Sequence, residues 1–203
     1  MKTRIAVLVS GGGTNLQALL DAQSRGEIPD GEIALVVSNK AGAYALERAQ
    51  KAGVPTALCL REKGAARADF EARLLDLLRA NDIGMIVLAG FMAILSADFV
   101  AHYPERIINI HPSLIPSFCG EGFYGLRVHQ AALDYGVKVT GATVHYVNEI
   151  PDGGRIIAQK AVEIQEGDTP ESLQRRVMEQ AEWILLPKAT EMVSKRLRME
   201  AEA

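Results

Sequence analysis

The chain has 203 residues, and its 48% hydrophobic and 23% charged residues are the proportions of an ordinary globular protein. The net charge of −3 argues against binding to nucleic acid or to an anionic membrane, and no apolar run is long enough to cross a bilayer. The length predicts one domain over residues 1–203. The two cysteines, Cys59 and Cys119, lack the spacing of a metal site or a disulfide framework, which predicts a cytoplasmic protein with free thiols and no metal.

The opening stretch of the chain has the layout of an anion-binding loop. Residues 4–9 (RIAVLV) predict a buried parallel strand, Gly11-Gly12-Gly13 follows, and an amphipathic helix begins at Thr14 or Asn15. Glycines let backbone N–H groups approach an anion, and the dipole of the helix favours negative charge at its start. We therefore predict an anion site here, with a tight turn that binds no ligand as the alternative.

The details of this loop favour a simple phosphate monoester over a nucleotide. A dinucleotide-binding loop needs a further glycine, where this chain has Leu16, and an acid after the second strand, where it has Asn39-Lys40. An ATP-binding loop needs Gly-Lys followed by Ser or Thr, and the sequence of this loop does not contain it.

The rest of the first half continues the alternation of strands and helices. Strands are expected at residues 32–38, 55–60, 84–89 and 107–111, and helices at 43–52, 65–81 and in a short segment from Ser96. This order predicts an α/β fold with a single doubly wound, mostly parallel, Rossmann-like sheet. The apolar residues after Gly90 fit either ordinary core or the wall of a pocket for a flat ring.

The second half adds a glycine- and aromatic-rich loop at residues 117–126, a helix, and an antiparallel C-terminal extension of the sheet. The helix is expected at 127–135, and two strands, 138–147 and 155–164, are joined by the turn 148–154. Thr169 and Pro170 begin a long C-terminal helix, which Pro187 is expected to kink or divide.

The most informative pair of side chains lies at the end of the strand 107–111. Asn109 and His111 are two residues apart and point to one face of the strand, and Pro112 ends it. An amide can steady a developing oxyanion while an imidazole moves protons, which suits acyl or formyl transfer. A core Asn with a His bonded to the backbone is the alternative. The other histidines, His102, His129 and His145, are expected to be structural or exposed.

Several longer segments resemble one enzyme family. They are VLVSGGGTNLQAL, VVSNKAGAYALERA, VLAGFMAIL, INIHPSLIPSF, GVKVTGATVHYV and a late DGG. Together they make nearly the whole chain similar to the phosphoribosylglycinamide formyltransferases of purine synthesis. The HPSL segment alone is shared with other enzymes that use formylated tetrahydrofolate, and the glycine-rich opening narrows the resemblance to this family.

The resemblance implies roles for particular residues. The catalytic Asn, His and Asp of the family match Asn109, His111 and Asp152. Its ribotide-binding residues match Gly12, Gly13, Thr14, Asn15 and Glu182. Its folate-binding residues match Arg67, Met92, Ala93, Ile94, Leu95, Asn109, Asn148, Glu149, Ile150, Pro151 and Asp152. Many members carry Arg where this chain has Ala93, so that contact with folate is lost or is made by the backbone alone.

The activity implied by the resemblance is direct transfer of a formyl group from 10-formyltetrahydrofolate, a co-substrate, to the amine of 5-phosphoribosylglycinamide. Residues 1–100 would bind the ribotide phosphate, and residues 101–203 would bind folate and carry the catalytic residues. The segment that contains Asp152 indicates a turn in the first place. If the fold brought this turn to His111, the charge of Asp152 would raise the pKa of His111. The partners are then small molecules alone, with a monomer and a homodimer both open.

Two other functions stay open. One is hydrolysis of the formyl folate, or transfer to another amine; such hydrolases usually carry an amino-terminal regulatory domain, whereas this chain starts directly at its first strand. The other is a nucleotide- or folate-binding regulatory protein, which would have no need for the three catalytic residues. A formyl-transfer assay with and without the ribotide separates these functions.

Overall fold

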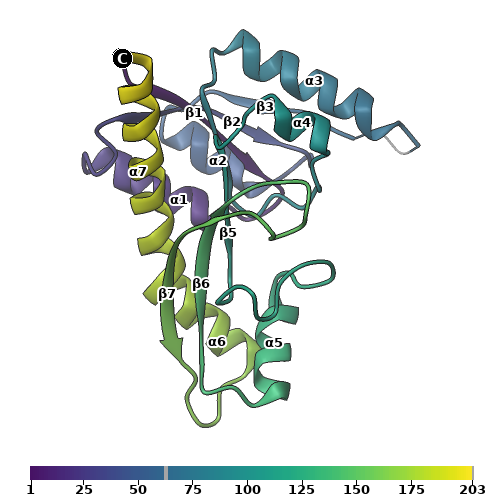
Figure 1. Cartoon of the computed structure of the whole chain (residues 1–203), viewed down its shortest axis with the longest axis vertical. Coiled ribbons are helices and arrows are strands. Elements are labelled where there is room, and N and C mark those ends of the chain that lie inside the picture. The colour runs from purple at the N-terminus through teal and green to yellow at the C-terminus, as the bar shows by residue number, and fades with distance from the viewer. Residues whose placement is uncertain (62–63, 203) are drawn as a thin grey trace.

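A single mixed sheet runs through the molecule (Figure 1). The computed structural model describes residues 1–61 and 64–202. Seven strands lie in the order β3-β2-β1-β4-β5-β6-β7; β1 to β5 are parallel, and β6 and β7 are antiparallel to their neighbours. The strands are β1 (Thr3–Val9), β2 (Gly31–Ser38), β3 (Thr56–Leu58), β4 (Met85–Leu88), β5 (Ile107–His111), β6 (Val139–Tyr146) and β7 (Ile156–Glu163). The predicted mostly parallel α/β sheet with an antiparallel extension is confirmed.

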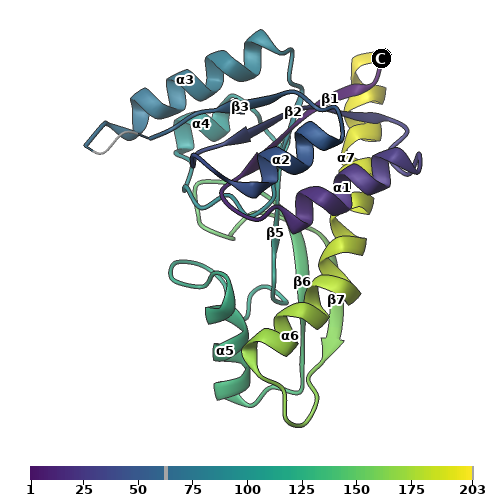
Figure 2. The same ribbon diagram turned by 180° about the vertical axis from the view of Figure 1, so that it is seen from behind.

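Helices cover both faces of the parallel part of the sheet. The helices of the chain are α1 (Thr14–Ser24), α2 (Tyr44–Lys51), α3 (Arg67–Ala80), α4 (Ala97–Ala101), α5 (Leu126–Tyr135), α6 (Pro170–Val177) and α7 (Trp183–Glu202). Figures 1 and 2 show α3 and α4 on one side of the sheet and α1, α2 and α7 on the other. None of these described helices has the length and apolar character needed to span a membrane.

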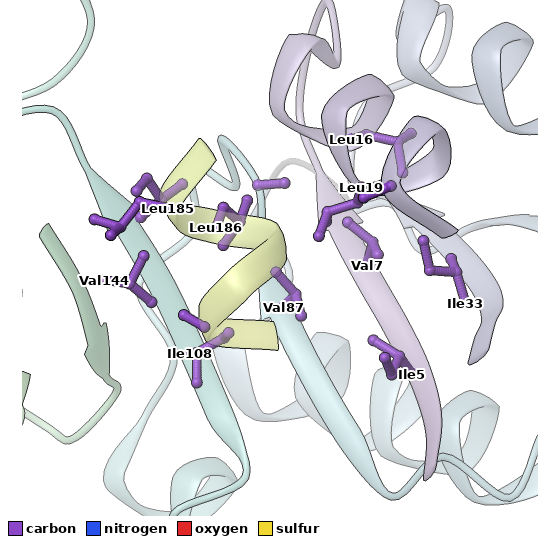
Figure 3. Close-up of a cluster of buried hydrophobic side chains, with 14 of the residues drawn as sticks. Ile5, Val7, Leu16, Leu19, Ile33, Val87, Ile108, Val144, Leu185 and Leu186 are labelled. Carbon is purple, nitrogen blue, oxygen red and sulfur yellow. The ribbon is translucent and has the colours of Figure 1, made fainter. Parts of the chain in front are cut away.

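The alternation of side chains along β1 builds a core on each face of the sheet. Val7 is fully buried and belongs to one apolar cluster with Leu19 of α1 and Leu186 of α7 (Figure 3). Leu8, the next residue, belongs to the cluster on the opposite face with Phe70 of α3. Because neighbouring residues of a strand point to opposite faces, a strand buried on both sides has an unbroken apolar sequence, as β1 does.

The antiparallel strands project beyond the parallel part and carry α5 and α6 (Figures 1 and 2). β5 pairs with β6 in a register that sets Asn109 directly opposite His145, and His111 opposite Thr143. Residues directly opposite each other share one face of the sheet. The pairing therefore brings a second histidine beside Asn109 and His111.

The C-terminal helix is interrupted earlier than the sequence predicts. A π-helical turn, η1 (Met178–Glu182), separates α6 from α7, whereas Pro187 lies inside α7. The expected kink or division at Pro187 is therefore wrong in position. A proline lacks the N–H that would bond to the carbonyl four residues earlier, here Trp183, the first residue of α7. The missing bond falls in the first turn of α7, directly after the π turn that already breaks the regular pattern.

Candidate functional site

A cavity of about 660 Å³ opens where the parallel strands end. Its wall is formed by the segments 90–95 after β4 and 109–112 at the end of β5, by the loop 120–125, and by residues between 147 and 152 after β6. Asn15 of α1 and Glu182 of η1 also line it. The volume is that of a small-molecule site, which is roughly 300–1,000 Å³ in proteins.

His111 ends β5, and both of its ring nitrogens face protein oxygens. Nε2 lies 2.9 Å from the carbonyl oxygen of Phe118, and Nδ1 lies 3.4 Å from Oδ2 of Asp152. Because a carbonyl oxygen only accepts hydrogen bonds, Nε2 carries a proton and donates it. Nδ1 is then the nitrogen that gains or loses the second proton, beside Asp152. Phe118 presents its carbonyl from a left-handed backbone conformation with a φ of 49°.

Asp152 is brought to His111 by the turn that follows β6. Its Oδ2 accepts the N–H of Gly120 at 2.9 Å, and its Oδ1 lies 3.4 Å from Nδ2 of Asn109. Asp152 has a φ of 56°, a conformation that residues other than glycine rarely adopt and that gathers at functional sites. The fold thus places Asp152 beside His111, as a catalytic role would require.

His145 belongs to the same cluster, although no pattern in the sequence indicates a partner for it. Its Nδ1 lies 2.8 Å from the carbonyl oxygen of Tyr146, an acceptor, so this nitrogen carries a proton. Nε2 lies 3.2 Å from Nδ2 of Asn109 and 3.5 Å from Oδ1 of Asp152. His145 is 2% exposed, as the expected structural role requires, and it contacts two of the candidate catalytic residues as well. Of the others, His102 is exposed and His129 is buried in α5.

Burial and charge act in opposite directions on the pKa values of this cluster. Burial lowers the pKa of His111 below its usual 6.5, and it outweighs the opposing effects of the Asp152 charge and the Phe118 carbonyl. The prediction that the Asp152 charge raises the pKa of His111 is confirmed for that interaction, and burial outweighs it. Burial raises the pKa of Asp152, but the hydrogen bond with His145, the charge of His111 and the Gly120 N–H together lower it. Asp152 is therefore a carboxylate at neutral pH.

A second polar pair lines the cavity at the start of α1. Oε2 of Glu182 accepts a hydrogen bond from Nδ2 of Asn15 at 2.6 Å. Glu182 is 6% exposed, and burial raises its pKa to about 7 against the opposing effect of the Asn15 amide. Glu182 ends the π turn η1, a rare conformation that often occurs at functional sites. A carboxyl group with such a pKa can hold or release a proton at neutral pH.

Glu182→Gln is expected to stabilise the fold more at about pH 8 than at about pH 5. The folded-state pKa of about 7 exceeds the ordinary 4.5, so between these values the native state binds more protons than the unfolded state, and stability falls as the pH rises. Gln cannot ionise and escapes this loss, which is at most about 3 kcal/mol at about 1.4 kcal/mol per pKa unit. Urea unfolding of both proteins at the two pH values measures the difference. An equal effect at both would contradict a raised pKa.

Most residues expected to bind ligands line the cavity. They are Thr14, Asn15, Met92, Ala93, Ile94, Leu95, Asn109, Asn148, Ile150, Pro151, Asp152 and Glu182. Gly12, Gly13, Arg67 and Glu149 lie outside its wall. Nε of Arg67 lies 3.9 Å from Oε1 of Glu71, a buried carboxylate that accepts hydrogen bonds from the N–H and the hydroxyl of Ser96. Arg67 thus contacts the carboxylate that holds Ser96, the residue directly after the segment 92–95, and it does not line the cavity itself.

The arrangement brings an amide, an imidazole and a carboxylate into one cavity. An amide and a protonated imidazole can donate hydrogen bonds to a developing oxyanion, while the carboxylate stabilises the imidazolium. Nδ2 of Asn109 already donates to Oδ1 of Asp152 and lies 3.2 Å from Nε2 of His145, so an oxyanion would compete with these two neighbours for the amide hydrogens. Over residues 1–61 and 64–202, no three His, Cys, Asp or Glu side chains come together as a metal site would require.

Comparison with known proteins identifies the family. A model of the formyl transferase family matches residues 3–190. The chain is 43% identical to the phosphoribosylglycinamide formyltransferase of Haemophilus influenzae over 87% of this chain and 81% of that protein. It is 44% identical to the trifunctional purine biosynthetic protein adenosine-3 of Gallus gallus over 95% of this chain, but it spans only 18% of that relative's length.

Solved structures agree with the sequence relatives. The glycinamide ribonucleotide transformylase 1 of Symbiobacterium toebii superimposes with a TM-score of 0.89 at 42% identity, over 96% of this chain and 89% of that one. The match covers both the parallel strands and the antiparallel extension that carry the site. The chain therefore belongs to the formyl transferase family.

Proposed function

We propose that this chain transfers a formyl group from 10-formyltetrahydrofolate to the amine of 5-phosphoribosylglycinamide. The observation that carries the proposal is the convergence of Asn109, His111 and Asp152 in one cavity, with Asn15 and Glu182 in the same wall. The names of the relatives in Haemophilus influenzae and Symbiobacterium toebii support the ribotide as the acceptor of the formyl group. The chain then acts in purine synthesis as a cytoplasmic enzyme whose partners are small molecules.

The reaction needs a stabilised oxyanion and a proton for the departing nitrogen. The amine attacks the formyl carbon, a tetrahedral intermediate forms, and the bond from that carbon to the folate nitrogen breaks. Asn109, and His111 protonated at Nδ1, donate hydrogen bonds to the oxygen that becomes negative. His111 then gives its Nδ1 proton to the leaving nitrogen, and the charge of Asp152 favours the charged form of the ring until that step. The attacking nitrogen passes one proton to Nδ1 of His111, which replaces the proton given to the leaving nitrogen, so the cluster returns to its starting state.

The remaining wall of the cavity divides between the two substrates. Glu182 and Asn15 receive the amine end of the ribotide, and a carboxyl group with a pKa of about 7 can take the proton that an ammonium must lose before it attacks. Met92, Ile94 and Ile150 are exposed apolar side chains of the wall, and a flat ring would cover them. Arg67 and Glu149 meet the part of folate that extends beyond the cavity.

In this proposal the chain is one domain whose halves have different tasks. Residues 1–100 bind the ribotide phosphate, and residues 101–203 carry the catalytic residues and most of the folate site. The segment 92–95 is the part of the first half that reaches folate. The glycine loop of residues 11–13 supplies backbone N–H groups for the phosphate, with Thr14 and Asn15 at the start of α1 beside it.

Gly12→Ala and Gly13→Ala separate ligand approach from backbone strain. A Cβ at Gly12 would meet nothing within 4 Å, whereas at Gly13 φ is +74° and a Cβ would lie 2.6 Å from Cβ of Ala45. We expect Gly12→Ala to fold normally and to raise the KM for the ribotide, because a methyl group blocks close approach of the phosphate. Gly13→Ala should also lose about 1–3 kcal/mol of stability. Kinetics with both substrates and thermal unfolding test this; a raised KM for folate alone would assign the loop to the other ligand.

The proposed function is tested by following loss of the formyl donor with and without the ribotide. We expect consumption only when the ribotide is present, with one formylated amine formed for each donor consumed. Equal consumption in its absence would favour a formyltetrahydrofolate hydrolase. Binding of the formyl folate without consumption under either condition would favour a regulatory binding protein.

A further inference from the structure

The first turn of α2 packs against the glycine loop and holds two of its carbonyl groups. The N–H of Ala45 donates to the carbonyl of Gly11 at 3.1 Å. Nε of Arg48, one turn further along α2, donates to the carbonyl of Gly12 at 2.8 Å. Two consecutive carbonyls of the loop are therefore fixed toward α2.

The direction of these carbonyls sets the direction of the next N–H groups. In a trans peptide the C=O and N–H bonds point to opposite sides. Gly12 and Gly13 consequently direct their N–H groups away from α2, and neither has a backbone or side-chain partner among the residues that the structure describes. Two consecutive N–H groups aimed the same way, next to the N-terminus of α1, are what an anion-binding loop requires.

Two further contacts hold the Arg48 side chain in the position from which it bonds to the Gly12 carbonyl. Its guanidinium lies 4.9 Å from the centre of the Tyr44 ring, and its Nη1 donates to Oε1 of Gln17 at 3.0 Å. Gly13 lies so close that a Cβ there would be 3.4 Å from Cδ of Arg48. The side chain therefore joins α2, the glycine loop and α1 into a single unit.

The position of Arg48 also argues against direct contact with the substrate. Its Nε and Nη1 are already bonded to the Gly12 carbonyl and to Gln17. It lines a pocket of about 290 Å³ beside α1 that shares only Thr14 with the wall of the catalytic cavity. Within the described residues, that wall contains no Lys or Arg. Backbone N–H groups and the dipole of α1 supply positive potential at the glycine loop, so the orientation of these N–H groups affects the affinity for a phosphate.

We infer that Arg48 is a positioning residue for the phosphate of the amine substrate, acting through the Gly12 carbonyl. The inference rests on the proposed function, because it takes the glycine loop to be the phosphate site. Arg48 fixes the Gly12–Gly13 peptide before the ligand arrives, so the phosphate meets N–H groups that are already aligned. Its charge also polarises that peptide, which strengthens the N–H as a donor.

Three variants test the inference. Arg48→Met keeps the apolar stem and removes the donor, Arg48→Lys keeps the charge without the planar pair of donors, and Arg25→Met is the matched control. Arg25 lines the same pocket but bonds to Glu27, not to the loop. We expect Arg48→Met to raise the KM for the ribotide about tenfold, which is the effect of losing one hydrogen bond to a charged group, with kcat and the KM for folate unchanged. Arg48→Lys should recover only part of this loss, and Arg25→Met should match the parent.

A second measurement does not depend on turnover. Ribose 5-phosphate is titrated into the protein while the backbone amide NMR signals of Gly12 and Gly13 are followed. In the parent both signals should shift and saturate, and in Arg48→Met the half-saturating concentration should rise. Shifts that are identical in the parent and in Arg48→Met would overturn the role of Arg48. Full recovery of the ribotide KM by Lys would overturn it as well, because charge alone would then suffice.

The outcome also separates this inference from the proposed function. If ribose 5-phosphate shifts neither amide in the parent, the loop is not the phosphate site and the assignment beneath the inference is wrong. If the parent responds but Arg48→Met raises the KM values of both substrates equally, Arg48 supports the fold in general and is not a positioning residue for the phosphate.

Discussion

Asp152→Asn is expected to lower turnover by about 10²–10⁴, the range that a positioned acid–base group contributes. Asp152 faces Nδ1 of His111 at 3.4 Å and accepts the N–H of Gly120, so it is both a charge and a fixed acceptor at the nitrogen that titrates. Asn keeps the shape and removes the charge. Asp134→Asn is a matched control, because Asp134 accepts from Gln130 on α5 and faces no residue of the cluster.

The pH dependence gives the sign of the coupling. The mechanism needs a proton on Nδ1 of His111, and burial already lowers the pKa of that group while the Asp152 charge opposes the decrease. Without the charge the pKa falls further, and the alkaline limb of the pH–rate profile moves to lower pH. A His111→Ala, Asp152→Asn double variant should lose far less than the product of the single losses. An unmoved profile together with independent losses would show that the two groups do not act as a unit.

Asn109→Ala is expected to lower kcat by about 10²–10³, the usual loss for one oxyanion donor. The two amide hydrogens of Asn109 face Asp152 and His145, so part of the loss will come from disorder among these partners. The KM values of both substrates should change little, because the amide acts on the charge that forms during reaction. Asn81→Ala, which removes an amide bonded to the Leu77 carbonyl at the end of α3, controls for the substitution itself. Near-normal turnover would contradict a catalytic role and would show that Asn109 is only a structural residue of β5.

The parts of the fold that follow from local pattern were predictable. β5 spans the predicted residues 107–111. Local sequence also predicts the apolar run of β1, the alternation of strands and helices, and the N-cap at Thr169, because each depends on residues that are neighbours in the chain. The end of β5 marked the site for the same reason, since Pro112 must end the strand just after His111. Asp152 became a candidate only through the resemblance to a family, because no local pattern says where a turn will pack.

The parts that were missed depend on geometry between distant segments. His145 joins the site because the antiparallel register sets it opposite Asn109, and a shift of one residue would turn it to the other face. The carbonyl of Phe118 and the N–H of Gly120 bind His111 and Asp152 through a loop whose left-handed residues follow no periodic pattern. The net pKa of His111 requires burial, which outweighs the neighbouring charge and has no sequence signature.

The most direct measurement follows a ¹³C-labelled formyl group by NMR during a single turnover. The proposal predicts that the label moves from the folate nitrogen to the amine of 5-phosphoribosylglycinamide and that free formate does not appear. With Asn109→Ala or Asp152→Asn the same transfer should occur at a greatly reduced rate. Label that accumulates as formate in the parent protein, whether or not the ribotide is present, would contradict direct transfer between the two substrates.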